Sequence, residues 1–298
     1  MTIRSGAPVV VAVDGSTTAL DAVRVAAREA ATRGRPLRVV HAFVWPLYDM
    51  PLIPVQGPVL DAGLREQAEQ IVADAVTEAH KTASDLAVTA AVVDGPATPV
   101  LLRESRDAAL LVLGSRGLDG FAELLMGSVA VQVCARVDCP VLVVKGEVRA
   151  DGPVVVGVDG SDLSTQTLGF AFEEASLRGA ELVAVHAWIT PTPTMPGDIL
   201  PLAYGVETLA EDEERVLAES LAGWSQRYPD VPVRHHVAYG AAASVLVRES
   251  ATAQLTVVGG HGRGTLAGML LGSVSHAVLH QSHGPLAIVR HHREEGGH

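Results

Sequence analysis

The sequence predicts an α/β fold built twice, as two doubly wound modules that each have a parallel sheet covered by helices. Three observations support this. Short Val-rich runs alternate with longer helical stretches, as in parallel sheets whose strands are buried on both faces. The chain matches itself when it is shifted by 145 residues. Its 298 residues are 48% hydrophobic and 19% charged, which suits globular domains and is enough for two cores.

The internal repeat keeps one constant offset from the first predicted strand to the last. VVVAVDGS (Val9–Ser16) falls on VVVGVDGS (Val154–Ser161), and Pro140 falls on Pro285. A match of this length indicates a duplication. We therefore predict domains at residues 1–146 and 152–290, with a short charged, Gly-containing linker between them. The tail, residues 291–298, is expected to be disordered.

Each half alternates strands and helices with short connections, which predicts a sheet covered on both faces. A Pro-rich stretch, Trp45–Pro58, follows the second strand, and a Gly-containing loop, Gly114–Met126, follows the fourth. The second half repeats this order, with its Pro-rich stretch at Thr190–Pro201. In chain order, the elements expected in the first half are strand Val9–Val13, helix Thr18–Arg33, strand Leu37–Phe43, helix Leu60–Ser84, strand Ala87–Val93, helix Pro99–Ser105, strand Ala109–Leu113, helix Ser128–Val137 and strand Val141–Val144.

Charge and composition exclude several function classes. The formal net charge is -12, and the second half supplies most of it. A protein that binds nucleic-acid phosphates or an anionic membrane needs a basic surface. We therefore expect neither nucleic acid nor a membrane as a partner. No apolar run approaches 18 residues and the start does not resemble a signal peptide, so we expect a cytoplasmic protein. Cys134 and Cys139 lack zinc-site spacing and are expected to be small buried hydrophobes.

The candidate site combines an aspartate with a glycine loop, once in each half. Asp14 and Asp159 follow the first strands, and the pattern G-x2-G-x9-G-S follows the fourth strands. In doubly wound sheets, ligands bind beyond the carboxyl ends of the strands, where the winding reverses. Glycines let backbone N–H groups approach phosphate oxygens, and the final Gly-Ser opens a helix whose N-terminus favours anions. The carboxylates suit ribose hydroxyls or an adenine edge, or they cap the first helix.

These motifs resemble those of the universal stress protein family of ATP-binding proteins, and the resemblance covers nearly the whole chain, twice. The tandem arrangement is similar to that of actinobacterial members. The resemblance implies a five-stranded sheet of order 3-2-1-4-5 and ATP bound with Mg²⁺. It also implies that the last strands of the modules pair, as an intramolecular pseudo-dimer, and leaves a homodimer of whole chains open. The nucleotide-binding residues that it implies are Asp14, Ala42, Gly114, Gly117, Gly127, Ser128 and Val129 in the first module and Asp159, Ala187, Gly259, Gly262, Gly272, Ser273 and Val274 in the second, to which we add Ser275.

Three functions remain open on the sequence. We expect a nucleotide-binding regulatory or stress-response protein, with ATP, ADP and AMP undistinguished. An enzyme, either a slow ATPase or a nucleotidyl or phosphoryl transferase, is the alternative. It is disfavoured because no general base and no dedicated lysine are evident near the loop. An ATP-free interaction protein is the third reading, although both halves keep the glycines and the aspartate.

Other polar residues receive structural interpretations. His41 and His186 lie in apolar strands and are expected to be hydrogen-bonded core residues. The run Glu211–Glu214 is expected to be a solvated helix face. Ser275 gives the second helix start an extra hydroxyl, which we expect to face the anion site and to tighten ATP binding there.

Overall fold

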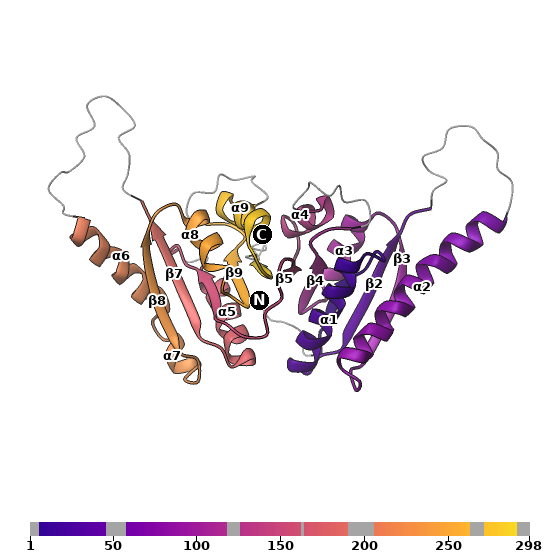
Figure 1. Cartoon of the computed structure of the whole chain (residues 1–298), viewed down its shortest axis with the longest axis horizontal. Coiled ribbons are helices and arrows are strands. Elements are labelled where there is room, and N and C mark those ends of the chain that lie inside the picture. Colours follow the sequence, from indigo (N-terminus) through magenta and orange to yellow (C-terminus); the bar gives the residue numbers. More distant parts are fainter. Residues whose placement is uncertain are drawn as a thin grey trace, which may run out of the picture. The chain divides into compact units, whose positions relative to one another are not determined.

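The computed structural model of the chain describes residues 6–45, 58–117, 126–161, 164–189, 206–262 and 271–290. The chain divides into two compact units, and the boundary along the sequence falls between Lys145 and Gly146. Both units are α/β, with strands and helices alternating along the chain, as the sequence predicts (Figure 1). Within the described residues, no helix is both long and apolar enough to cross a membrane.

The first unit is a five-stranded parallel sheet in the order β3-β2-β1-β4-β5. This confirms the order 3-2-1-4-5 that the family resemblance implies. In register, β1 lies between its neighbours with Val9 opposite both Leu37 and Leu110. The strands are β1 (Val9–Ala12), β2 (Leu37–Phe43), β3 (Val88–Asp94), β4 (Leu110–Gly114) and β5 (Val141–Val144).

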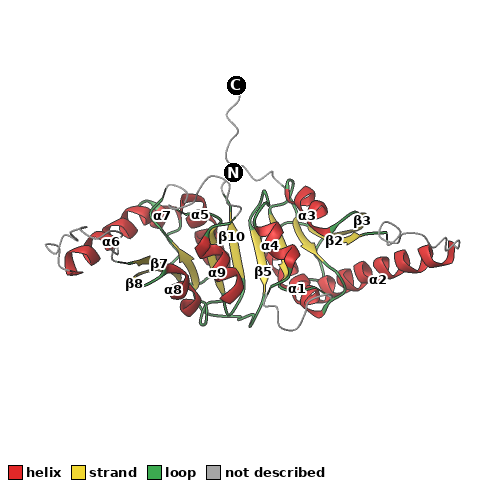
Figure 2. Cartoon of the chain, turned by 90° about the horizontal axis from the view of Figure 1, so that it is seen from above, coloured by secondary structure: helices red, strands yellow, loops and turns green. Residues whose placement is uncertain are grey.

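The helices of the first unit pack in two pairs, α1 with α2 and α3 with α4. Because parallel crossovers are right-handed, the reversal of winding between β3 and β4 puts the two pairs on opposite faces of the sheet. Figure 2 shows the unit from above, with strands between helices. The helices are α1 (Thr17–Thr32), α2 (Pro58–Thr82), α3 (Ala97–Ser105) and α4 (Ser128–Cys134).

The second unit repeats the topology, with strand order β8-β7-β6-β9-β10. Its elements are β6 (Val154–Gly157), α5 (Ser164–Arg178), β7 (Leu182–Trp188), α6 (Val206–Leu221), α7 (Trp224–Arg227), β8 (Val233–Tyr239), α8 (Ala242–Glu249), β9 (Leu255–Gly259), α9 (Ser273–Gln281) and β10 (Leu286–Val289).

The core of each unit is the sheet itself. Val9, Val10 and Val11 have no exposed surface, and neither do Val154 and Val156. Strands covered on both faces are apolar at every position rather than at alternate ones, which is why the Val-rich runs predict them well. Cys134 and Cys139 are both buried, as expected.

Two helices differ from the prediction by more than two residues. The helix expected to end at Val137 ends at Cys134, and a turn follows in which Arg136 N donates to Val133 O. In the second unit the repeat predicts one long helix after the Pro-rich stretch, but α6 ends at Leu221 and a short α7 follows. Gly223 lies between them with φ +82°, a left-handed conformation that ends a helix and suits glycine.

Candidate nucleotide site

Each unit has a cavity beyond the carboxyl ends of its central strands, where the winding reverses. The first has a volume of about 600 Å³ and the second about 540 Å³. The structure brings all of the predicted site residues to these two cavities. Those lining the first are Asp14, Ala42, Gly114, Gly117, Gly127, Ser128 and Val129. Those lining the second are Asp159, Ala187, Gly259, Gly262, Gly272, Ser273, Val274 and Ser275.

The aspartate lies against the glycine loop, and this contact explains why the second glycine of the loop has no side chain. A Cβ on Gly117 would lie 2.5 Å from Asp14 Oδ2, and a Cβ on Gly262 would lie 2.6 Å from Asp159 Oδ2. Real Cβ atoms do not approach an oxygen so closely, so any other residue would displace the carboxylate. The first strand and the loop therefore meet as one wall of the cavity, at the reversal point that the sequence predicts.

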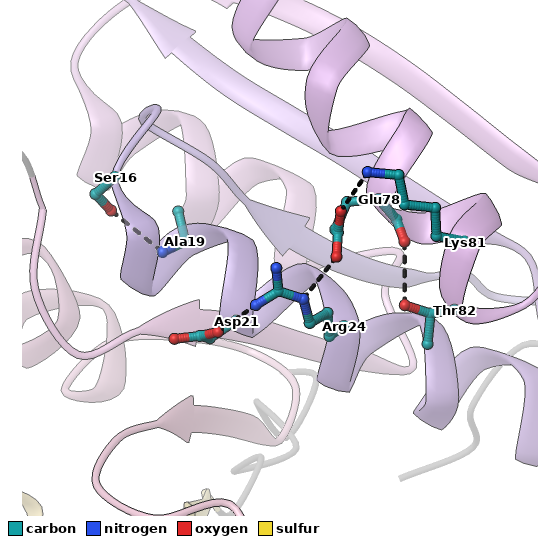
Figure 3. Close-up of polar contacts among 7 residues, drawn as sticks. All are labelled: Ser16, Ala19, Asp21, Arg24, Glu78, Lys81 and Thr82. Carbon is teal, nitrogen blue, oxygen red and sulfur yellow. Dashed lines mark hydrogen bonds and ion pairs between the residues drawn. The ribbon is translucent and has the colours of Figure 1, made fainter.

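The aspartate is not the cap of the first helix. The N-cap of α1 is Ser16, whose Oγ accepts from Ala19 N at 3.1 Å (Figure 3). Asp14 Oδ1 instead accepts from Ser16 N at 3.0 Å, and Asp159 Oδ1 accepts from Ser161 N at the same distance. Capping, the alternative reading of Asp14, is thus wrong, and its carboxylate lies on the cavity wall.

The helices that follow the loops begin differently from α1. Their N-caps are Gly127 and Gly272, and neither helix start has a side-chain cap. The loop is closed beneath them by Gly127 N donating to Ser115 O and by Gly272 N donating to Gly260 O, both at 2.8 Å. The first N–H groups of a helix have no intrahelical acceptor, so uncapped starts on a cavity wall suit an anion.

The second cavity is more polar than the first. At the 145-residue offset, four alanines of the first unit become polar residues of the second. Ala19, Ala22, Ala68 and Ala130 correspond to Ser164, Thr167, Glu213 and Ser275, all of which line the second cavity. Thr167 is 1% exposed, and its Oγ1 has no hydrogen-bond partner among the described residues.

The role expected of Ser275 is wrong. Its Oγ donates to Gly259 O and therefore has no hydrogen left for a phosphate. The residue is buried, and the hydroxyl ties α9 to the end of β9 instead of facing the anion site. The extra donor on which we based tighter binding in the second unit is absent. The loop inserts of the two halves, Leu118 to Met126 and Arg263 to Leu271, lie almost wholly outside the described residues.

The two strand histidines are hydrogen-bonded as expected, but they also line the cavities. His41 Nδ1 lies 2.8 Å from Val13 O, and His186 Nδ1 lies 2.8 Å from Val158 O. His186 Nε2 lies 2.7 Å from Glu213 Oε2. Glu213 belongs to the acidic run that we expected to be a solvated face, so for this residue the expectation is wrong.

Two cations that the sequence reading missed follow the last strands. The peptide before Lys145 is tied to the glycine loop, because Ser115 N donates to Val144 O at 3.0 Å. Burial lowers the pKa of Lys145 to about 8. Arg290 lies against the second loop, since a Cβ on Gly260 would lie 2.8 Å from its Cγ. The constant offset aligns the two residues, and that is the signal that could have identified them.

The repeated fold and its paired cavities define a tandem doubly wound α/β protein, and comparisons with known proteins identify its family. The sequence profile of the universal stress protein family matches residues 7–145 and 152–290. A universal stress protein of Mycobacterium tuberculosis is 41% identical over 296 residues, covering 95% of this chain and 96% of the relative. The chain belongs to the universal stress protein family, which confirms the resemblance to tandem actinobacterial members.

One solved structure matches the fold over nearly the whole chain. The crystal structure of a universal stress protein from Archaeoglobus fulgidus matches with a TM-score of 0.70 and 19% identity, covering 96% of this chain and 99% of that chain. Another universal stress protein, crystallised in complex with cAMP, is 27% identical, covers 46% of this chain and 95% of its own, and has a TM-score of 0.35.

Proposed function

We propose that each unit binds one adenine nucleotide, ATP with Mg²⁺, and that occupancy of the two sites gives the protein a regulatory role in stress response. One observation carries the proposal. The same set of residues (an aspartate, three loop glycines and a serine at an uncapped helix start) lines a cavity of 540–600 Å³ in both units. Cavities of this size are typical of small-molecule and cofactor sites.

The residues present fit a nucleotide. The loop glycines and the uncapped starts of α4 and α9 supply N–H donors for phosphates. Asp14 and Asp159 offer acceptors for ribose hydroxyls. A Cβ on Gly127 would meet Ser115 O at 3.5 Å, an ordinary contact, so this glycine is not required by packing. Its lack of a side chain instead leaves the space between loop and helix open for a ligand.

Mg²⁺ would be held chiefly by the phosphates of the nucleotide. Among the residues that the structure describes, no group of three or more His, Cys, Asp or Glu side chains is placed to hold a metal ion. A regulatory role is favoured over catalysis because the described part of each cavity lacks the charge-neutralising clamp of phosphoryl-transfer enzymes. Among the described residues that line the two cavities, Arg116 is the one Lys or Arg.

Equilibrium dialysis against ATP and Mg²⁺ tests the proposal. The full chain should bind two equivalents, and Gly127→Glu and Gly272→Glu should each remove one, because the added carboxylate occupies an anion site. Gly63→Glu is the matched control: Gly63 lies on an exposed position of α2 with open space around it, so both sites should remain. Fewer than 0.1 equivalents in the unmodified chain, or unchanged binding in folded Gly127→Glu, would refute the assignment.

A further inference from the structure

One hydroxyl in the wall of the second cavity is enclosed without a hydrogen-bond partner. Thr167 belongs to the first turn of α5, is 1% exposed and lines the cavity. Its Oγ1 has no partner in the part of the chain that the structure describes. Such a hydroxyl lowers the stability of the fold, because it has lost its bonds to water without replacing them. A molecule bound in the cavity can supply the missing partner.

Other helical threonines of the chain do have a partner. Thr77 and Thr82 of α2 each donate to the backbone oxygen four residues earlier, at 2.9 and 3.0 Å. A bond to the preceding turn is a common solution for a threonine in a helix. The hydroxyl of Thr167 instead faces the glycine loop, since a Cβ on Gly259 would lie 3.2 Å from its Oγ1. Its direction therefore suits a ligand rather than its own helix.

A fixed carboxylate lies at the same turn of α5. Ser164, three residues before Thr167 and hence on the same helix face, donates to Asp159 Oδ1 at 2.7 Å. The same oxygen accepts from the N and the Oγ of Ser161, at 3.0 and 2.6 Å. These bonds hold the carboxylate in place. Its charge disfavours a phosphate at this end of the cavity and favours a neutral group that donates a hydrogen bond.

A ribose hydroxyl satisfies both side chains at once. A sugar hydroxyl has one hydrogen to donate and lone pairs with which to accept. It can therefore donate to Asp159 and accept from Thr167 in one pose. A phosphate oxygen accepts only, and the aspartate repels it.

The first unit lacks the hydroxyls of this arrangement. Ala19 and Ala22 occupy the positions of Ser164 and Thr167, and Ala22 has no exposed surface. Asp14 is kept on the wall of the first cavity. The first site therefore has the acceptor for a ribose hydroxyl without the threonine donor.

We propose that Thr167 is a ligand-binding residue of the second site. Its hydroxyl donates to a ribose hydroxyl of the bound nucleotide, so the second site distinguishes ribonucleotides from deoxyribonucleotides more strongly than the first. The inference rests on the proposed function. One net hydrogen bond corresponds to a change in affinity of about fivefold.

Nucleotide affinities of the isolated second site test the assignment. In the chain with Gly127→Glu, which blocks the first site, equilibrium dialysis gives the dissociation constants for ATP, 2′-deoxy-ATP and 3′-deoxy-ATP. Thr167→Val keeps the shape of the side chain and removes the hydroxyl. It should weaken ATP binding about fivefold and leave the affinity for one of the two deoxynucleotides unchanged, because that nucleotide lacks the bonded hydroxyl. Thr167→Ser keeps the hydroxyl and should keep the discrimination.

Two controls separate the hydroxyl from the fold. Thr165→Val makes the same change at an exposed position of α5 and should leave all three affinities unchanged. In the chain with Gly272→Glu, the first site should bind ATP equally with and without Thr167→Val. Without nucleotide, Thr167→Val should unfold about 2 °C or more above the native chain, because a methyl group replaces an unsatisfied buried hydroxyl.

The outcomes separate the two proposals. If the second site with native Thr167 binds none of the three nucleotides, the proposed function fails there. If folded Thr167→Val binds ATP as well as the native residue does, or weakens all three nucleotides by the same factor, the role of Thr167 is wrong and nucleotide binding stands. An unfolding temperature of nucleotide-free Thr167→Val below that of the native chain would also overturn the role, because the hydroxyl would then have a partner in the free protein.

Discussion

The corresponding helix–helix contact, called the joint below, is charged in the first unit and aromatic in the second. In the first unit, α1 packs on α2 through charged residues. Arg24 Nε donates to Glu78 Oε1 at 2.6 Å, and Lys81 Nζ donates to Glu78 Oε2 at 3.1 Å (Figure 3). Arg24 also bonds Asp21 on its own helix. The joint is thus a small network of charges centred on Glu78.

In the second unit the joint between α5 and α7 is aromatic. The ring of Phe172 stacks on Trp224, with centroids 5.3 Å apart, and on Tyr228 at 5.5 Å. The guanidinium of Arg227 lies over Trp224, 5.5 Å from the ring centroid. A Cβ on Gly169 would lie 3.0 Å from Trp224 Cη2, so the indole packs directly against the helix backbone.

The offset of 145 residues shows that the exchange is coordinated. Arg24 and Glu78 correspond to Gly169 and Gly223, so both charges are absent together. Ala27, Ala79 and Ala83 correspond to Phe172, Trp224 and Tyr228, so the three rings occur together. A joint of either kind is complete, whereas a mixture would leave an unpaired charge or an unfilled space. The backbone plan of the duplicated unit is therefore compatible with two different joints.

The largest effect is expected from Trp224→Ala, which removes the centre of the aromatic joint. Truncating a fully buried aromatic residue costs about 3–5 kcal/mol. Trp224 is partly exposed, so its loss should cost roughly 2 kcal/mol. Hydrogen exchange should show α5 losing protection while α1 keeps it. Equal loss in both helices would mean that the joint does not stabilise its own unit.

Gly223→Ala tests the helix break, with an expected cost of about 1 kcal/mol. The residue has φ +82° and open space around it, so the cost comes from backbone strain alone. Gly63→Ala in α2 is the matched control, because Gly63 is helical and also has open space around it. It should stabilise by about 0.5–1 kcal/mol. Urea unfolding that shifts both variants in the same direction would contradict the left-handed break.

Gly169→Ala should change stability by less than 1 kcal/mol in the native background. Its helix propensity gain of about 1 kcal/mol is opposed by the close contact with Trp224. In the Trp224→Ala background the opposition disappears, and the same substitution should stabilise by about 1 kcal/mol. A double-mutant cycle measures this difference. Additive effects would show that the indole does not pack on Gly169.

These joints also mark what the sequence predicts and what it does not. Strands buried on both faces can be predicted from the sequence, because every residue in a strand such as Val9–Ala12 is apolar. The glycine loops can be predicted because they occur twice in register. The contact of Gly117 with Asp14 could be predicted, because the reversal of winding places the ends of the first and fourth strands side by side. Glu213 could not be placed, because the rotation of α6 about its axis depends on packing that a run of four acids does not encode. The direction of the Ser275 hydroxyl likewise depends on the distance between α9 and Gly259, which is a property of the folded chain.

The smallest effect is expected from the charged joint, and its signature is pH dependence. Hydrogen bonds from Arg24 and then from Lys81 lower the pKa of Glu78 below its ordinary value of 4.5. A carboxyl whose folded pKa is depressed contributes stability above its unfolded pKa and loses it as the pH falls through the folded value. The thermal unfolding temperature of Glu78→Gln should therefore lie below that of the native chain at pH 7 and converge with it as the pH falls through the folded pKa of Glu78.

The charged joint also predicts a salt dependence and has a control on the same helix. The network is partly exposed, with the side chain of Arg24 41% and that of Glu78 15% accessible. Added salt should therefore reduce the difference in unfolding temperature between the native chain and Glu78→Gln at pH 7. Glu66→Gln removes an exposed carboxylate from α2 outside the joint, and its unfolding temperature should equal that of the native chain at both neutral and acid pH. The second unit has glycines in place of Arg24 and Glu78, so its joint should keep its hydrogen-exchange protection through the same acid range. If α5 lost protection together with α1 in this acid range, the acid transition would belong to the whole chain and not to the network around Glu78.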